Sequence, residues 1–165
     1  MRGMPLFEHE NLTIDRDLLL EFFVVFSKFE FALKNSTFLK GDESHADPDW
    51  DCFAVSLRGP FRVSASSELK EACEYLLLNP PMKQAVVNNR LAWSSNDPGA
   101  PSKVERLLLL VRRVRNNLFH GGKFSAGGFE DTPRQERLLK SALIILAECL
   151  RLSPETRELY HHAFI

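Results

Sequence analysis

Apolar residues recur at three- and four-residue spacing in several stretches of the chain, which is the period of an amphipathic helix. The first such stretch covers residues 14–38. Its apolar positions are Leu18, Phe22, Val25, Phe26, Phe29, Ala32 and Leu33. Thr13 or Asp15 could cap its start, because both side chains accept hydrogen bonds from free helical N–H groups. Gly41 and the polar run around it end the pattern, so the sequence predicts a long first helix.

Later stretches predict several further helices. They cover residues 48–57, 66–78, 82–95, 103–120, 133–152 and a short segment that begins at Ser153-Pro154. Asp47 would cap the first of them, with Pro48 at its first position. Ser66 or Ser67 would cap the second. The glycine pair at 121–122 would end the long helix that starts after Ser102.

The pattern predicts no clear β-structure. No two neighbouring stretches alternate strictly between apolar and polar residues across a hairpin turn, and the closest candidate, 52–66, could hide only a short pair. We therefore expect an all-α bundle with two long core helices and several shorter helices. It would form a single domain over residues 1–165, with its core at 14–152 and a short C-terminal helix over 153–165.

Composition narrows the class of protein. A chain of 165 residues can bury a core in one domain, and its 44% hydrophobic and 26% charged residues are ordinary for a soluble protein. The formal net charge of −1 provides no global positive field that would draw the chain onto nucleic acid. A polyanionic partner would therefore need a local basic patch. The phenylalanines at 22–31 have core spacing rather than that of a base-stacking platform.

The cysteines and the apolar runs indicate a cellular compartment. Cys52, Cys73 and Cys149 are far apart and have no metal-ligand spacing, and the first residues contain no apolar leader. An odd number of thiols without a leader is typical of a reducing cytoplasm. No apolar run is long enough to span a membrane. We therefore expect a cytoplasmic protein that uses no metal or other cofactor and has no membrane partner.

The predicted helix at 103–120 contains the most concentrated chemistry. Its main apolar stripe consists of Val104, Leu107, Leu108, Val111, Val114 and Leu118. Arg115 falls within this stripe, and a buried arginine needs an anion, a carboxylate or a groove. Asn116 and His120 share a helix face. Arg115 and His120 lie roughly 140° apart around the helix, so the helix end, the reach of arginine or a second copy of the chain must bring them together.

An ordinary explanation competes with a site at this position. Cations near a helix C-terminus interact favourably with the helix dipole, and glycine is the usual residue after a helix. The five cations that this effect could explain are Arg112, Arg113, Arg115, His120 and Lys123.

The residues at 115–120, Arg-Asn-Asn-Leu-Phe-His, match a known short motif. They have the Arg-Asn-x3-His form of the Arg-x4-6-His motif, at the end of a leucine-rich late helix. The segment 26–36, "FSKFEFALKNS", is similar to a first long helix of bacterial proteins that carry this motif. The chain therefore resembles the HEPN superfamily of α-helical ribonuclease-like domains over about 18–152.

The resemblance implies a metal-independent endoribonuclease that acts on RNA as a homodimer through the motif helix. Carried over by residue, Arg115, Asn116 and His120 would form the catalytic site. The RNA 2′-hydroxyl would attack its own phosphate and leave 2′,3′-cyclic phosphate ends. The family setting would be toxin–antitoxin biology or phage defence, with a protein antitoxin as partner. Some toxin members carry a modifiable tyrosine two residues after the histidine, but Gly122 stands there in this chain, which disfavours that modification.

Neighbouring polar residues could support such a site. Lys123, in the glycine-rich loop that follows the helix, would bind an RNA phosphate, as would Arg112 and Arg113. Glu30 and Lys34 are four residues apart and by default form a surface ion pair. Alternatively both face the cleft, where Glu30 could hold Arg115.

Other readings of the chain are open. His161 and His162 lack further metal ligands at suitable spacing, and the acidic segment 42–51 is either a divalent-cation site or a solvated cap region. The chain could also be a non-catalytic helical module that binds RNA or a nucleotide at the same place. A third reading is a protein-interaction module whose cations only cap a helix.

Overall fold

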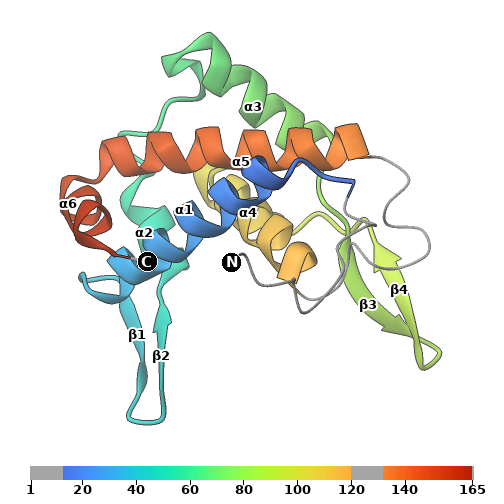
Figure 1. The fold of residues 1–165 in the computed structure, drawn as a ribbon, viewed down its shortest axis with the longest axis horizontal. Helices are drawn as coiled ribbons and strands as arrows, with labels where there is room; N and C mark the ends of the chain where they lie inside the picture. The colour runs from blue at the N-terminus through green and yellow to red at the C-terminus, as the bar shows by residue number, and fades with distance from the viewer. Residues whose placement is uncertain (1–12, 120–131, 165) are drawn as a thin grey trace, which may run out of the picture.

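The computed structural model describes residues 13–119 and 132–164 of the chain. The described part is mostly helical (Figure 1). Its helices are α1 (Arg16–Lys34), α2 (Trp50–Ser56), the short 3₁₀ helix η1 (Val63–Ala65), α3 (Ser67–Leu78), α4 (Lys103–Phe119), α5 (Thr132–Leu152) and α6 (Pro154–His162). Its strands are β1 (Leu39–Asp42), β2 (His45–Pro48), β3 (Lys83–Val87) and β4 (Arg90–Ser94).

The long helices α1, α4 and α5 form the centre of the fold. α5 packs against α1, α3 and α4, while α2 packs against α4 and α6 against α1. Figure 1 shows α3 on one side of α5, with α1 and α4 on the other and the two hairpins projecting beyond them. The apolar faces of these helices meet in one core, as their helical periodicity predicts.

An aromatic cluster joins α1 to α2. The ring of Trp50 lies 5.3 Å from that of Phe26 and 5.4 Å from that of Phe29, and Phe29 contacts Phe53 edge-on at 5.6 Å. All four side chains are buried. Truncating such a buried ring to alanine costs about 3–5 kcal/mol. The cluster therefore fixes α2, and the residues that precede it, against the middle of α1.

The helix starts largely confirm the capping signals in the sequence. Asp15 Oδ1 accepts a hydrogen bond from the N–H of Leu18 at 2.8 Å, and Ser66 Oγ accepts one from the N–H of Leu69 at 3.0 Å. Ser102 Oγ accepts one from the N–H of Glu105 at 3.3 Å, so α4 begins where predicted. α2 begins later than predicted, because Asp49 rather than Asp47 caps it and Pro48 ends the preceding strand.

The prediction of a purely helical protein is wrong at residues 82–95. Instead of a short helix, β3 and β4 form an antiparallel hairpin with Val87 opposite Arg90. Its two-residue turn consists of Asn88 and Asn89, with φ of 51° and 57°. Both angles are positive, which is the geometry of a type I′ turn, and asparagine tolerates it. The Asn-Asn pair between two short apolar runs was the sequence signal for this hairpin.

A second hairpin replaces the loop expected after α1. β1 pairs with β2 so that Gly41 lies opposite Ala46. Gly41 has φ of +131°, and a Cβ on it would lie 2.2 Å from the carbonyl oxygen of His45, so only glycine fits. Asp42 Oδ1 accepts a hydrogen bond from the N–H of Ser44 at 2.8 Å and stabilises the turn. The polar sequence hid this strand pair because all but one of its residues are exposed.

Other predictions hold for the described residues. α5 and α6 lie where the periodicity placed them, and α6 is anchored by Tyr160, whose ring meets that of Phe29 edge-on at 6.2 Å. The segment 52–66 contains no strand pair but α2 and η1. Within residues 13–119 and 132–164, no helix is both long enough and apolar enough to cross a membrane.

Candidate functional site

The buried face of α4 explains how its last turns present polar side chains. Val104, Leu107, Leu108, Val111 and Val114 are buried, as the stripe predicts. Arg115 is not fully buried, because 31% of its side chain is exposed at the edge of that stripe. Asn117 occupies the buried position instead, and its amide donates a hydrogen bond to the carbonyl oxygen of Met82 at 2.7 Å. This contact ties α4 to the segment before β3.

Arg115 is held from three sides. Its Nη2 lies 3.9 Å from Glu30 Oε2 on α1, and its Nη1 donates a hydrogen bond to Asn116 Oδ1 at 3.1 Å. The guanidinium also lies 5.0 Å from the ring centre of Phe119 and 5.7 Å from that of Phe26. The aromatic contacts restrict the plane of the guanidinium while leaving part of its edge open to solvent. Glu30 is thus the carboxylate partner that an arginine in this stripe requires.

Lys34 does not share this position. It lies one turn further along α1 and is exposed. The ion pair of Glu30 is with Arg115 rather than with Lys34. Glu30 therefore forms an ion pair between α1 and α4, in place of the pair within α1 that is usual for residues four apart on a helix.

A polar cavity of about 270 Å³ lies beside Arg115. We call it the Arg115 cavity. Its lining comes from α1, β1, β2, α2 and α4, and consists of Phe26, Glu30, Lys40, Asp47, Pro48, Trp50, Arg112, Arg115 and Asn116. The β1–β2 hairpin therefore supplies one wall, and no pattern in the sequence predicts that Lys40 and Asp47 lie near the motif helix.

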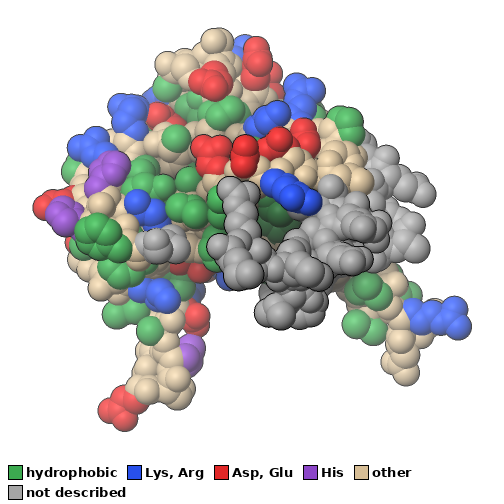
Figure 2. Space-filling model, in the orientation of Figure 1, with side chains coloured by type: hydrophobic (Ala, Val, Ile, Leu, Met, Phe, Trp, Pro, Cys, Tyr) green, Lys and Arg blue, Asp and Glu red, His purple; other side chains and the backbone are tan. Residues whose placement is uncertain are grey.

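Most charges around the Arg115 cavity are already compensated. Arg112 Nη1 donates to Asp51 Oδ1 at 3.0 Å, and Lys40 Nζ lies 3.6 Å from Asp49 and 3.9 Å from Asp51. A hydrogen bond from the N–H of Cys52, assisted by Lys40, holds the pKa of Asp49 below its usual value. On the face shown in Figure 2, cationic and acidic side chains are likewise interspersed. The site is therefore a balanced polar pocket and not a broad basic surface.

The predicted RNA-binding arginines separate in the structure. Arg112 lines the Arg115 cavity, whereas Arg113 faces the other way. Arg113 Nη1 donates to the carbonyl oxygens of Pro81 at 3.2 Å and Asn96 at 3.0 Å, which lie on either side of the β3–β4 hairpin. Burial lowers the pKa of Arg113, although a guanidinium stays charged at neutral pH. Its visible role is to hold the two ends of this hairpin.

Two predicted site residues cannot be placed. His120 and Lys123 lie outside the described residues, together with the glycine pair expected to end α4. Asn116 is exposed on the last turns of α4 and contacts Arg115 through its side-chain oxygen. The described part therefore brings Arg115, Asn116, Glu30 and Arg112 together.

Trp50 is a site residue that the sequence did not indicate. It is only 3% exposed, and it lines the Arg115 cavity. Its indole Nε1–H is buried without a hydrogen-bond partner among the described residues. Nothing in its local sequence distinguishes it from a core tryptophan.

No metal centre is visible in the part of the chain that the structure covers. Within residues 13–119 and 132–164, no group of three or more His, Cys, Asp or Glu side chains could hold a metal ion. His45 contacts two carboxylates of its own hairpin, Asp42 at 3.1 Å and Asp47 at 3.5 Å. His161 and His162 are exposed on α6.

Comparisons with protein-family models, curated proteins and solved structures each return no match for this chain.

Proposed function

We propose that the chain is a metal-independent endoribonuclease of the HEPN type, with its active site at the end of α4. One observation carries this proposal. Arg115, the first residue of the Arg-Asn-x3-His motif, lies at the edge of a polar cavity with part of its guanidinium exposed and Asn116 bonded to it. An arginine used only to end a helix would need neither a carboxylate partner nor a cavity.

The proposed reaction needs only groups of this chain and the RNA itself. His120 would take the proton from the RNA 2′-hydroxyl, since histidine titrates near neutral pH. The 2′-oxygen would attack the adjacent phosphorus, the bond from phosphorus to the 5′-oxygen would break, and the leaving 5′-oxygen would take up a proton from water or from the protonated His120. Arg115 would donate forked hydrogen bonds to the extra negative charge of the phosphorane. Asn116 would position Arg115, to which it is already bonded. The products would be a 2′,3′-cyclic phosphate and a 5′-hydroxyl.

We propose that the active form is a homodimer in which two copies of α4 face each other. A helix carries residues five apart on different faces, so Arg115 of one protomer would meet the catalytic groups of the other across a two-fold axis. A role as a toxin or defence effector, restrained by a protein antitoxin, rests on the motif alone. The balanced charges around the Arg115 cavity favour a small or structured RNA over indiscriminate binding.

A cleavage assay tests the proposal. Labelled RNA is incubated with the wild type, Arg115→Ala and Lys140→Ala in the presence of EDTA. Lys140 is an exposed lysine of α5 that does not line the Arg115 cavity, and it serves as the matched control. We expect the wild type and Lys140→Ala to cut RNA, and Arg115→Ala to lose about 10²–10³-fold in rate, as for removal of one charge-stabilising donor.

Two other results would replace the proposal. If no variant cuts RNA but Arg115→Ala loses RNA binding, the chain is a binding module that uses the same cavity. If Arg115→Ala changes neither cleavage nor binding and alters only stability, α4 is an interaction helix with a conventional basic end.

A further inference from the structure

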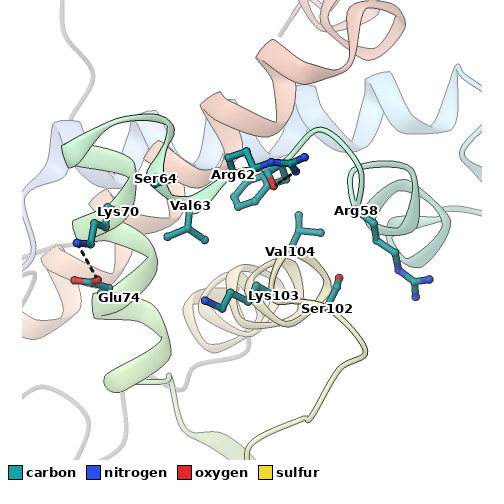
Figure 3. A pocket seen from close by; sticks show the side chains of 10 residues that line it. Arg58, Arg62, Val63, Ser64, Lys70, Glu74, Ser102, Lys103 and Val104 are labelled. Atoms are coloured by element: carbon teal, nitrogen blue, oxygen red, sulfur yellow. Dashed lines mark hydrogen bonds and ion pairs between the residues drawn. The ribbon is translucent and has the colours of Figure 1, made fainter.

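A second and larger cavity lies at the opposite end of α4. Its volume is about 450 Å³, which falls in the range of small-molecule sites. Its walls come from the segment after α2, from η1, from α3 and from the first residues of α4 (Figure 3). We call it the Lys103 cavity. Lys103 and Arg115 are twelve residues apart on α4, so the two cavities are separated by about 18 Å along the helix.

Cations predominate in the Lys103 cavity. Its lining contains Arg58, Arg62, Lys70 and Lys103 but a single carboxylate, Glu74. These cations come from three segments of the chain, namely the one after α2, α3 and α4, so no run in the sequence indicates them. The fold brings these segments together around one cavity.

Only part of this positive charge is neutralised within the protein. Arg58 is fully engaged, because its Nε and Nη2 donate to Glu105 at 2.8 and 2.6 Å, and Figure 3 shows it directed away from the other side chains. Lys70 lies 3.9 Å from Glu74 across one turn of α3, a weak exposed pair. Lys103 has no ion-pair partner in the part of the chain that the structure describes.

Arg62 is positioned without being neutralised. Its Nη1 donates hydrogen bonds to the carbonyl oxygens of Phe61, at 2.9 Å, and Gly59. Both acceptors are uncharged, so the positive charge of Arg62 remains available to a ligand. Arg62 and Lys103 border the cavity from opposite sides in Figure 3, one from the segment before η1 and one from α4.

The remaining lining suits a ligand with an apolar part. Phe61 and Val104 are buried and Val63 is half-buried, and together they provide an apolar wall beside the cations. Ser64 adds an exposed hydroxyl group. The first turn of α4 also directs free backbone N–H groups toward this end of the helix, which favours an anion.

We propose that the Lys103 cavity binds the phosphomonoester group of a small molecule about the size of a mononucleotide. Lys103, Arg62 and Lys70 would surround the phosphate, and the apolar wall would contact the rest of the ligand. A concavity of this volume with an apolar wall fits such a ligand better than an extended RNA strand, which would need a basic groove along the surface. This proposal does not depend on the ribonuclease activity.

The test is an NMR titration of the ¹⁵N-labelled full chain at low salt with phenyl phosphate and with adenosine 5′-monophosphate. Phenol and adenosine serve as matched probes without phosphate. We expect both phosphates to shift the amide signals of Val63, Ser64, Lys103 and Val104, and the neutral probes to shift them at least tenfold less at equal concentration. Lys103→Ala and Arg62→Ala should each weaken phosphate binding about fivefold or more, because each substitution removes one ionic contact to the phosphate. Arg90→Ala, which removes an exposed cation from β4, should leave binding unchanged.

Three results would overturn this proposal. The amide shifts could fall elsewhere on the protein, or phosphate binding could be unaffected by Lys103→Ala and Arg62→Ala. The third result is that a short RNA shifts these amides while neither small phosphate does, which would make the cavity part of an RNA surface. Lys103, Arg62 and Lys70 are all exposed. Their substitution should therefore leave the protein folded, with an amide spectrum like that of the wild type in the absence of ligand. None of these results bears on cleavage at Arg115, so the two proposals fail separately.

Discussion

The two ends of α4 distribute positive charge in opposite ways. At its C-terminal end, Arg112 and Arg115 are close together in the sequence, but acidic groups of α1 and α2 balance them. At its N-terminal end, Lys103 is inconspicuous in the sequence, yet the fold brings further cations to it with one carboxylate among them. The electrostatic potential of the folded surface therefore cannot be read from a cluster of cations in the sequence. It depends on whether acidic residues from distant segments pair with those cations.

The difference also separates two kinds of site. The Arg115 cavity holds its arginine between a carboxylate, an amide and two rings, which is an arrangement that fixes orientation. The Lys103 cavity leaves Arg62, Lys70 and Lys103 exposed and at most weakly paired, which favours capture of a charged ligand. Orientation matters most for a group that must meet a transition state, whereas uncompensated charge matters most for binding.

The largest expected effect concerns the geometry of Arg115. Arg115→Lys keeps the charge but loses the planar fork and its aromatic contacts, so we expect about 10²-fold slower RNA cleavage. Lys103→Arg, the matched conservative change at the other end of α4, should leave cleavage within about twofold, because residue 103 lies about 18 Å along the helix from Arg115 and takes no part in the proposed reaction. A labelled-RNA assay measures both rates. If Arg115→Lys cleaves as fast as the wild type, the orientation of Arg115 does not matter, and the two ends of α4 do not differ in the way described.

The next effect separates Arg113 from its neighbour. Arg113→Ala would leave the carbonyl oxygen of Pro81, a buried residue, without this donor and would release the exposed Asn96, at a cost of about 1–3 kcal/mol in the free energy of unfolding. Arg112→Ala should cost less than about 1 kcal/mol, because its partner Asp51 is mostly exposed. Urea denaturation of both variants measures the difference. A larger loss for Arg112→Ala would contradict the assignment of Arg113 as the structural arginine.

A smaller effect concerns the acidic compensation at the Arg115 cavity. Asp51→Asn should release Arg112 and remove one of the two carboxylates beside Lys40, and RNA binding at low salt should become about two- to fivefold tighter. The gain should vanish near 0.5 M salt, where exposed charges are screened. Fluorescence anisotropy with a labelled RNA measures this, with Glu43→Gln on the tip of the β1–β2 hairpin as control. Equal affinities for Asp51→Asn and the wild type would mean that Asp51 does not limit the potential of the cavity.

The smallest effect concerns the cysteines, whose reactivity reports on the packing of the helices that carry them. Cys73 on α3 is fully buried, and burial raises its pKa to about 11. Cys149 is also buried and its pKa is raised, whereas Cys52 is exposed. Because the thiolate is the reactive form, a thiol reagent at pH 8 should label Cys52 alone in the folded protein and all three cysteines in denaturant. Rapid native labelling of Cys73 would show that the packing of α3 against the rest of the core opens readily.

The helices could be predicted from the sequence because burial and capping leave local signals. The spacing of Leu18, Phe22 and Phe29 on α1, and the caps Asp15 and Ser66, agree with the structure. The hairpins were missed since their residues are largely exposed and show little apolar alternation. The turn at Asn88 and Asn89 was the one usable signal.

Some residues of the candidate site could likewise be predicted from the sequence, and others could not. Arg115 and Asn116 are adjacent in a motif, so the sequence alone could nominate them, and the need of Arg115 for a carboxylate indicated Glu30 as one candidate. Trp50 and Lys40 reach the Arg115 cavity through tertiary packing and a hairpin that the sequence did not predict. The Lys103 cavity has no local signal at all, because its cations belong to separate segments.

The measurement that tests the central claim most directly is an analysis of RNA ends after incubation with the wild type and with His120→Ala, both in EDTA. The account predicts that the wild type leaves 2′,3′-cyclic phosphate and 5′-hydroxyl ends, and that a single 2′-deoxy substitution at the cleavage position blocks the reaction. His120→Ala should leave the RNA intact. Cleavage that survives His120→Ala, or that yields 5′-phosphate ends, would contradict an active site at the end of α4.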